Sequence, residues 1–338
     1  MKSYCKNFVF TWAHIEEAFH LWRKAQAGKK NYHRVLSEYG SEEKLIEEVF
    51  NEIAGKNLQF KPIHYYWHRD PINQKLRNIG VQSIKQQLVD YVVVLALQEF
   101  LDARIGYYQV ASMPGKGQLF ASRTAQKWIR EGGYWVHMDV KQYYPSVNHD
   151  VVRSIIGKYV RSSEVRYVVD TLLGTYGRGL MIGSYFSLKM AQLVLSFAYH
   201  HLEGRVAHQL HYLDDVLLMD PSKERLKAAA QELERFLRDE LELTVKPWKL
   251  CKVGDDEPID IAGYVVRPTK TTLRSSIFLR ARRSFKRFEQ SPTEENARSV
   301  CAYWGWVKNT HSMHFQQSNR IPQLVGEAAE KVSNSMIH

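Results

Sequence analysis

The adjacent carboxylates Asp214 and Asp215 are the residues of this 338-residue sequence whose types and spacing point most clearly to chemistry. They lie between two largely apolar runs, 210–213 and 216–219. This pattern predicts two strands joined by a tight turn, because Asp bonds its own backbone and tolerates turn conformations. Two carboxylates at the tip would raise each other's pKa, and a bound divalent cation is the simplest way to keep both ionised. A solvated turn is the alternative for the pair taken alone.

Asp139 supplies a third carboxylate, at the end of a stretch that predicts a buried strand. Residues 134–140 are rich in aromatic and β-branched side chains, and Pro145 limits how far a strand can continue. Three acids on neighbouring strands can hold two Mg²⁺ ions, with Mn²⁺ as an alternative. Two such ions suit in-line attack of a hydroxyl on a phosphate, because one activates the attacking oxygen and the other stabilises the leaving group.

The acids belong to an ordered series of motifs that resembles those of reverse transcriptases. The stretch Tyr212–Asp215 resembles the family's Tyr-x-Asp-Asp motif, and Asp139 with Tyr144 resembles its first palm motif. Three more segments resemble family motifs in place and order: the Gly-x-x-x-Ser segment Gly183–Ser187, the motif-D lysine in Trp248–Lys249, and the primer-grip turn in Ile261–Tyr264. The resemblance covers nearly the whole chain.

Within that family, the chain most resembles the compact bacterial enzymes of diversity-generating retroelements. Ile182 precedes the glycine of the middle segment, as it does in those enzymes, whereas most reverse transcriptases have Gln there. A thumb stretch within residues 303–312 also resembles theirs. Three positions depart from the pattern usual in that group: Met181, Leu188 and Gln192. A related bacterial reverse transcriptase of phage defence is therefore the alternative.

The resemblance implies an α+β fold, a right-hand polymerase with fingers, an antiparallel-sheet palm and a small helical thumb. It divides the chain into an N-terminal helical region (1–60), fingers (61–135, with part of 150–185), a palm (136–272), and a thumb with the C-terminal tail (273–338). The implied activity is RNA-directed addition of deoxynucleotides (dNTPs) to a primer 3′ hydroxyl. The implied partners are template RNA, a primer, dNTPs and the cDNA product, with room for an accessory protein.

The resemblance also implies catalytic roles for individual residues. Asp139 and Asp214 would bind the metal ions directly, and the main-chain carbonyl of Val140 would add a ligand. Asp215 would support the pair by charge and hydrogen bonding. Lys249 is the candidate proton donor to the departing pyrophosphate, and a surface lysine without that role is the alternative.

Nucleotide contacts are implied at two places. Lys75 and Arg77 lie in a segment that resembles the fingers strand whose basic side chains meet the triphosphate, and Arg can hold two phosphate oxygens. A solvated surface strand is the alternative for both. Tyr144 occupies the position where a bulky ring crowds a ribose 2′ hydroxyl. Ile182 and Gly183 would lie beside the nascent base pair.

Primer and template contacts are implied at Gly263 and Tyr264 and along a thumb helix. Between residues 277 and 288 the apolar side chains share one helical face, and cations on the other faces suit a duplex backbone. These cations are Arg280, Arg283, Lys286 and Arg287. An ordinary solvated helix is the alternative. Next, Ser291–Glu294 predicts a capping box that starts a further helix, with Pro292 at its first position.

Periodicity predicts further helices. Residues 1 to about 60 are expected to be helical, with apolar residues at 45, 49 and 53 and a stop at Gly55. Helical patterns also cover 84–101 and, with an amphipathic face, 222–240.

Composition agrees with a nucleic-acid partner without identifying one. The formal net charge is +11 and the isoelectric point is about 9.4, which suits a polyanion. The three cysteines have no metal-ligand spacing and are expected to be reduced thiols. The most apolar segment, 91–97, is far shorter than the ~20 residues needed to span a bilayer. We therefore expect a cytoplasmic protein with no membrane partner.

Two other classes of function stay open. An RNA-synthesising polymerase would use the same metal chemistry, although a bulky ring at Tyr144 favours deoxynucleotides. A nonenzymatic nucleic-acid-binding protein would explain the charge but would leave the three acids without a role.

Overall fold

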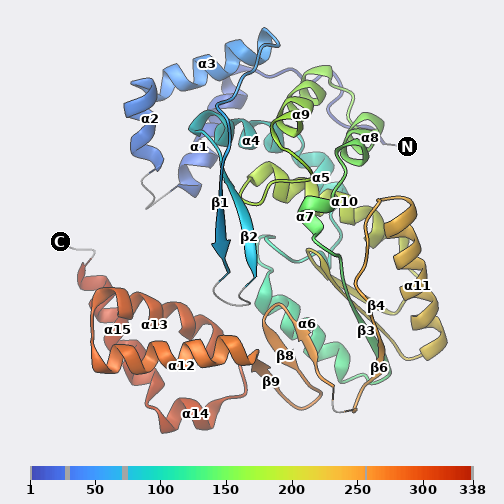
Figure 1. The fold of residues 1–338 in the computed structure, drawn as a ribbon, viewed down its shortest axis with the longest axis vertical. Coiled ribbons are helices and arrows are strands. Elements are labelled where there is room, and N and C mark those ends of the chain that lie inside the picture. The colour runs from blue at the N-terminus through green and yellow to red at the C-terminus, as the bar shows by residue number, and fades with distance from the viewer. Residues whose placement is uncertain (1, 27–30, 71–74, 256, 336–338) are drawn as a thin grey trace.

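The protein is a mixed α+β structure (Figure 1). The computed structural model describes residues 2–26, 31–70, 75–255 and 257–335. Helices gather at the N-terminal end, a four-stranded sheet lies in the middle, and a helical bundle forms the C-terminal end (Figure 1). Within the described residues, no helix combines the length and the apolar character that crossing a membrane requires.

The described part of the N-terminal region is largely helical, as predicted, with α1 (Trp12–Ala25), α2 (Asn31–Tyr39) and α3 (Glu42–Ala54). Helix α3 buries Leu45, Val49 and Ile53 and ends at the predicted Gly55, because the four-residue spacing aligns these side chains on one face. The three helices pack around α4 (Ile84–Ala96), whose apolar residues are almost all buried. Helix α5 (Gln98–Arg104) follows α4 directly.

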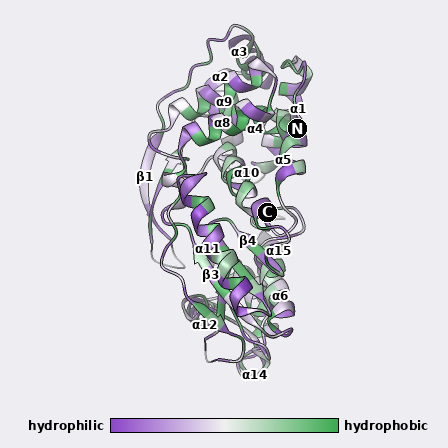
Figure 2. Ribbon diagram, turned by 90° about the vertical axis from the view of Figure 1, so that its right-hand side faces the viewer, coloured by the Kyte–Doolittle hydropathy of each residue, from purple (hydrophilic) through white to green (hydrophobic). Residues whose placement is uncertain are grey.

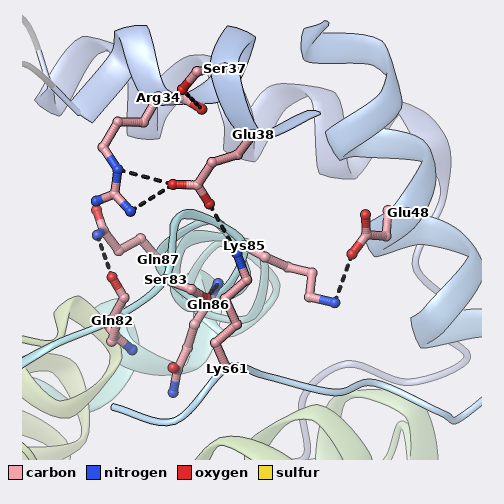
Figure 3. A network of polar contacts seen from close by, with 10 residues as sticks. All are labelled: Arg34, Ser37, Glu38, Glu48, Lys61, Gln82, Ser83, Lys85, Gln86 and Gln87. Atoms are coloured by element: carbon pink, nitrogen blue, oxygen red, sulfur yellow. Dashed lines mark hydrogen bonds and ion pairs between the residues drawn. The ribbon is translucent and has the colours of Figure 1, made fainter. Parts of the chain in front are cut away.

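Ion pairs attach α3 to α4, and others lie on α2 close by (Figure 3). Lys85 of α4 is nearly buried, and its ammonium lies 2.8 Å from carboxylate oxygens of both Glu48 and Glu52 on α3. Glu38 of α2 joins Arg34 at 2.6 Å and Lys61 at 3.3 Å. A buried ammonium needs such partners, since an unpaired charge away from water is costly. The N-terminal region is therefore attached to α4 by charge as well as by its apolar core.

A two-stranded antiparallel ribbon follows, formed by β1 (His64–Arg69) and β2 (Leu76–Val81). Every residue of β1 is exposed, and Trp67 reaches 69% exposure. The ribbon leaves the N-terminal helices and descends toward the level of α6 (Gln118–Ile129) and the C-terminal bundle (Figure 1). Its base is held by the central part of the chain, because the Gly80 N–H donates to the Ile182 carbonyl at 2.9 Å.

The central sheet is antiparallel, with strand order β4-β5-β3-β6. Its strands are β3 (Tyr134–Asp139), β4 (His208–Tyr212), β5 (Asp215–Asp220) and β6 (Leu250–Lys252). Side chains alternate between two faces, so the sheet divides two apolar cores. Val136 and Val216 belong to the core on one face, whereas Trp135 and Leu217 belong to the core on the other.

Helices cover the first face of the sheet. They are α8 (His149–Tyr159), α9 (Ser163–Thr175), α10 (Tyr185–His201) and α11 (Lys223–Asp239), and the one-turn α7 (Tyr143–Ser146) precedes them. Helix α11 confirms the helix predicted over 222–240, with Ser222 capping its N-terminus. Both hydrophilic and hydrophobic colours run along α11 in Figure 2, which is typical of a helix with one face in a core.

The second face of the sheet is covered by α6 and by a small antiparallel sheet. That sheet consists of β7 (Ile259–Ile261), β8 (Tyr264–Val266) and β9 (Thr271–Leu273). The bundle comes next, with α12 (Ser275–Gln290), α13 (Glu294–Val307), α14 (Met313–Ser318) and α15 (Ile321–Ser335). Its apolar residues join the same core, so this covering layer and the bundle share one interior.

The start of α13 corrects one prediction. Thr293, and not Ser291, caps the helix by accepting a hydrogen bond from the Asn296 N–H, and Pro292 lies before the helix. Ser291 instead ends α12, because its N–H donates to the Arg287 carbonyl at 2.8 Å. The side chain that caps α13 therefore comes two residues after the one predicted.

Candidate active site

Strand pairing brings the three predicted acids to one edge of the central sheet. Asp139, the last residue of β3, stands directly opposite Asp215, the first residue of β5. Asp215 also pairs with Tyr212 of β4, so Leu213 and Asp214 form the predicted tight turn between the two strands. The Val140 N–H donates to the Asp214 carbonyl at 3.1 Å and ties this turn to the end of β3. Acids separated by 75 residues in the sequence therefore meet at a single edge.

The turn holds Asp214 in an unfavourable environment for a negative charge. Its pKa is raised to about 6, first by burial and then by the charges of Asp215 and Asp139, while Arg77 acts in the opposite direction. Burial disfavours the ionised form, and like charges add to that effect. A bound cation would offset this unfavourable charge, and the predicted metal site stays a prediction.

Two residues that the sequence analysis did not single out also contact the acids. The Lys246 ammonium lies 2.6 Å from Asp139 Oδ1 and forms an ion pair with it. The backbone N–H of Lys246 also donates to the Asp139 carbonyl at 2.9 Å. His137 Nε2 lies 3.5 Å from Asp215 Oδ1, a close approach without the geometry of a hydrogen bond. Alternation along β3 could have indicated His137, because residues 137 and 139 share a face. No local pattern indicates Lys246, which is 107 residues from Asp139.

The donor atoms at this edge suit Mg²⁺ or Mn²⁺. Carboxylate oxygens are the ligands that these hard cations prefer. Val140 can add its carbonyl oxygen, because an extended residue directs its N–H and C=O to the same side and its N–H already faces Asp214. Within the ranges that the structure describes, the acids do not form a ready-made cluster of three metal-binding side chains. The residues fit the ions in chemistry and charge, and direct ligation remains a prediction.

Tyr144 and Arg77 lie close to the acids from two other directions. Tyr144 belongs to α7, and burial raises the pKa of its hydroxyl to about 12, with a further contribution from Asp214 and an opposing one from Arg77. Arg77 comes from β2 and pairs with Asp70 across the ribbon at 3.2 Å. The predicted sugar-selecting ring and one predicted phosphate-binding cation thus face the same edge. Lys75, just before β2, is exposed.

Ile182 and Gly183 lie against β2. Ile182 forms a parallel bridge with Ile79, and Gly183 adopts a φ of 112°, in a region that favours glycine. A Cβ at Gly183 would lie 2.7 Å from the Gly80 carbonyl oxygen, closer than such atoms approach. Gly183 is exposed and Ile182 is half-buried, so both can still meet a ligand.

Lys249 is placed differently from Lys246. It is exposed and pairs with Glu257, which raises the pKa of its ammonium. It stands immediately before β6, whose first residue, Leu250, pairs with Val136. The lysine that touches an acid in this structure is Lys246, and the role predicted for Lys249 remains a prediction.

The predicted primer-grip turn lies under the bundle. Ala262 and Gly263 both have positive φ, and a Cβ at Gly263 would lie 2.8 Å from Ile277 and 2.9 Å from Trp306. The Tyr264 ring is buried, with its centre 5.2 Å from that of Trp306. A contact between this ring and a primer, as predicted from sequence, would require the ring to leave the core.

Helix α12 presents the predicted basic surface. It buries Ile277, Ala281, Phe285 and Phe288 on one face, as the periodicity predicted. Its other faces carry four cations that are exposed and a fifth, Arg280, that is half-buried; the exposed ones are Arg282, Arg283, Lys286 and Arg287. Arg282 was not among the residues predicted. The arrangement suits a polyanion lying along the helix.

Comparisons with known proteins show what the chain is similar to. A family model described as "Reverse transcriptase (RNA-dependent DNA polymerase)" matches residues 68–266. Apo telomerase from Candida tropicalis aligns with a TM-score of 0.52 and 15% identity, over 82% of this chain and 59% of the telomerase chain. Telomerase of the same organism with a TWJ fragment of telomeric RNA aligns with a TM-score of 0.48 and 14% identity, over 73% and 53%. Among curated proteins, no relative matches.

The likeness to apo telomerase confirms the predicted α+β polymerase fold. The ribbon with its helices, the central sheet and the C-terminal bundle correspond to the predicted fingers, palm and thumb, and this division stays a prediction. The chain spans about six tenths of the length of the telomerase chain that it matches, 59%. At this identity the likeness concerns the fold alone.

The raised pKa of Asp214 predicts a pH-dependent metal affinity. Below about pH 6 the carboxyl is protonated, so a metal ion must displace the proton, and the apparent affinity should fall by up to about tenfold per pH unit. Above that pH the affinity should level off. Calorimetric titration with Mn²⁺ over a range of pH tests this, with Asp214→Asn as a control that should bind weakly and lose the dependence. An affinity that stays constant through pH 6 would contradict the assignment.

Proposed function

The chain belongs to the reverse transcriptase (RNA-dependent DNA polymerase) family, and we propose that its palm acids catalyse RNA-templated synthesis of DNA from a primer. The observation that carries the proposal is the register that sets Asp139 opposite Asp215 and beside the Asp214 turn. These acids lie within the part of the chain that matches the family model. We retain the predicted boundaries for the subdomains: 1–60, 61–135, 136–272 and 273–338.

The acids would hold the divalent ions that the family uses. When bound, two Mg²⁺ ions activate the primer 3′ oxygen and stabilise the departing pyrophosphate. Asp139 and Asp214 would bind the ions directly, with the carbonyl of Val140 as a further ligand. Asp215, which pairs across the sheet with Asp139, would hold the negative charge needed to keep both ions in place. Their partial burial strengthens these interactions relative to those in water.

The nucleotide would lie between the fingers ribbon and the palm. Arg77 would bind phosphate oxygens through its planar guanidinium, and Lys75 would add charge near them. Tyr144 would stand beside C2′ of the sugar, because its ring lies close to both Asp214 and Arg77. Ile182 and Gly183 would form the surface under the nascent base pair. Lys249 would donate a proton to pyrophosphate after leaving Glu257.

The primer and template would lie along the thumb and the small sheet. The cations of α12 would follow the phosphate backbone, as an exposed basic helix can do without reading sequence. The turn at Gly263 would support the primer strand from beneath α12. The template RNA and any accessory protein are partners whose identity depends on the biological role.

For that role we propose a low-fidelity enzyme of a diversity-generating retroelement. The supporting feature is Ile182, which offers no side-chain amide to the nascent pair. The departures at Met181, Leu188 and Gln192 favour the second candidate, a reverse transcriptase of phage defence. Error frequency on a defined template distinguishes the two, because diversification requires errors and a defence enzyme does not require low fidelity.

Removal of either metal-binding acid should abolish synthesis. Asp139→Ala or Asp214→Ala should reduce primer extension on an RNA template by at least about 100-fold, because each loses transition-state charge stabilisation without opening a core cavity. Asp239→Ala removes an exposed acid of α11 and should leave extension unchanged. Extension within about twofold of wild type by a folded Asp139 or Asp214 variant would overturn the metal assignment.

Truncation of Tyr144 should relax sugar selection. Tyr144→Ala opens space beside C2′ without touching the acids, so ribonucleotides should be incorporated much more readily while deoxynucleotides are still accepted. The measurement is the ratio of the two incorporation efficiencies. Tyr144→Phe keeps the ring and should keep the ratio. An unchanged ratio in the alanine variant would assign sugar selection to another residue.

An amide at position 182 should raise fidelity. Ile182→Gln adds hydrogen-bonding groups next to the nascent pair, so misaligned pairs should be penalised more and the error frequency should fall. Each ~1.4 kcal/mol changes selectivity tenfold, so even one restored contact should be visible. Sequencing of products at matched extension tests this, with Ile182→Leu as the apolar control. An equal or higher error frequency in the Gln variant would favour the defence enzyme.

A further inference from the structure

A second buried acid lies away from the metal site and has no role in the chemistry described above. Asp90 belongs to α4 and is 1% exposed, although it is not paired with any lysine or arginine among the described residues. Burial raises the pKa of its carboxyl to about 6, against the effect of the hydrogen bonds it accepts. A buried carboxylate persists only where hydrogen-bond donors surround it.

The donors come from two segments: the residue that precedes the cap of α4, and the start of α10. Asp90 Oδ2 accepts from the Ser184 hydroxyl at 2.6 Å and from the Phe186 N–H at 3.2 Å, both at the start of α10. Asp90 Oδ1 accepts from the Gln82 amide at 3.1 Å, just after β2. The negative charge also suits the N-terminus of a 17-residue helix. One carboxylate thus fixes the start of α10 and the end of the fingers strand together.

These two segments carry the proposed nucleotide contacts. Ser184 directly follows Ile182 and Gly183, and Gln82 follows the strand that carries Arg77. The segments also touch each other, since Gly80 donates to the Ile182 carbonyl and a Cβ at Gly80 would lie 2.2 Å from Met181 Sδ. The surface under the base pair and the phosphate-binding strand are therefore held in one relative position.

We propose that Asp90 is a positioning residue for the incoming nucleotide, which fixes Ile182 and Gly183 against the strand of Arg77 without touching the substrate. This inference rests on the proposed polymerase function and deepens it. Asp90 acts through Ser184, which caps α10 by accepting from the Ser187 N–H. Loss of the carboxylate would release the cap and loosen the nucleotide surface while leaving the acids of the sheet edge in place.

Asp90→Asn is the sharpest change, because it keeps the shape and removes the charge. Donors face both oxygens of Asp90, so the amide nitrogen of Asn must meet one of them in either orientation. The Kd for a dNTP on a primer with a dideoxy end should rise about tenfold, a ratio equivalent to ~1.4 kcal/mol. The maximal rate at saturating dNTP and the affinity for Mn²⁺ should stay within about twofold of wild type.

Asp220→Asn provides the matched control. Asp220 is also 1% exposed and accepts from the backbone N–H of Ala207 and Ser222 and from Arg225, but it lies at the opposite end of β5 from the acids. Its substitution should lower the unfolding midpoint and leave the dNTP Kd unchanged. Ser184→Ala is the second test variant, and it replaces Asp90→Asn if that variant does not fold. It breaks the same hydrogen bond from its other end, so it should also weaken dNTP binding.

These measurements distinguish the positioning role of Asp90 from the proposed polymerase function. Wild-type extension of a primer on RNA is the test of the proposed function, and it does not depend on Asp90. Weaker dNTP binding in Asp90→Asn or Ser184→Ala, but not in Asp220→Asn, would support the positioning role. An unchanged dNTP Kd in a folded Asp90→Asn variant, or an equal rise in Asp220→Asn, would overturn it while the polymerase function stands.

Discussion

The pairing of β3 with β5 is the constraint on which the rest of the structure depends. It sets Asp139 opposite Asp215 and places the Asp214 turn beside both. Because side chains alternate along a strand, a slip of one residue would turn Asp139 to the opposite face and exchange the two cores. The apolar residues prevent that slip, since Val136 packs against the helical face and Trp135 against the face with the small sheet and thumb. Core packing thus fixes the position of the chemistry.

The same site holds negative charges that are partly buried, which is unfavourable without a cation. A chain with a net charge of +11 gathers three acids at one edge, and burial of Asp214 beside two other acids raises its pKa. Lys246 and Arg77 offset part of this charge, but both come from distant segments. Interactions in a partly buried site are stronger than in water, so acids that are unfavourable alone become favourable ligands for a cation. The clustered negative charge that destabilises the site without a cation is therefore what would bind a cation there.

Strand β2 and the segment before α10 are joined by backbone contacts that require small residues. Gly80 and Gly183 approach so closely that a side chain on either would meet neighbouring atoms within 3 Å. Asp90 secures this junction through Ser184 and Gln82. Lys85, about one turn earlier on α4, secures α3 through Glu48 and Glu52. A single helix thus connects the N-terminal region, the fingers ribbon and the start of α10.

The sequence by itself determined the local features of this protein. The hairpin at Asp214, the helix over 222–240, the stop at Gly55 and the faces of α12 follow from spacing and turn chemistry, which act over a few residues. Only the tertiary structure decided which distant side chains meet. Strand register and packing between segments far apart in the chain set three such contacts. They are the ion pair of Lys246 with Asp139, the hydrogen bond from Ser184 to Asp90, and the packing of Tyr264 against Trp306.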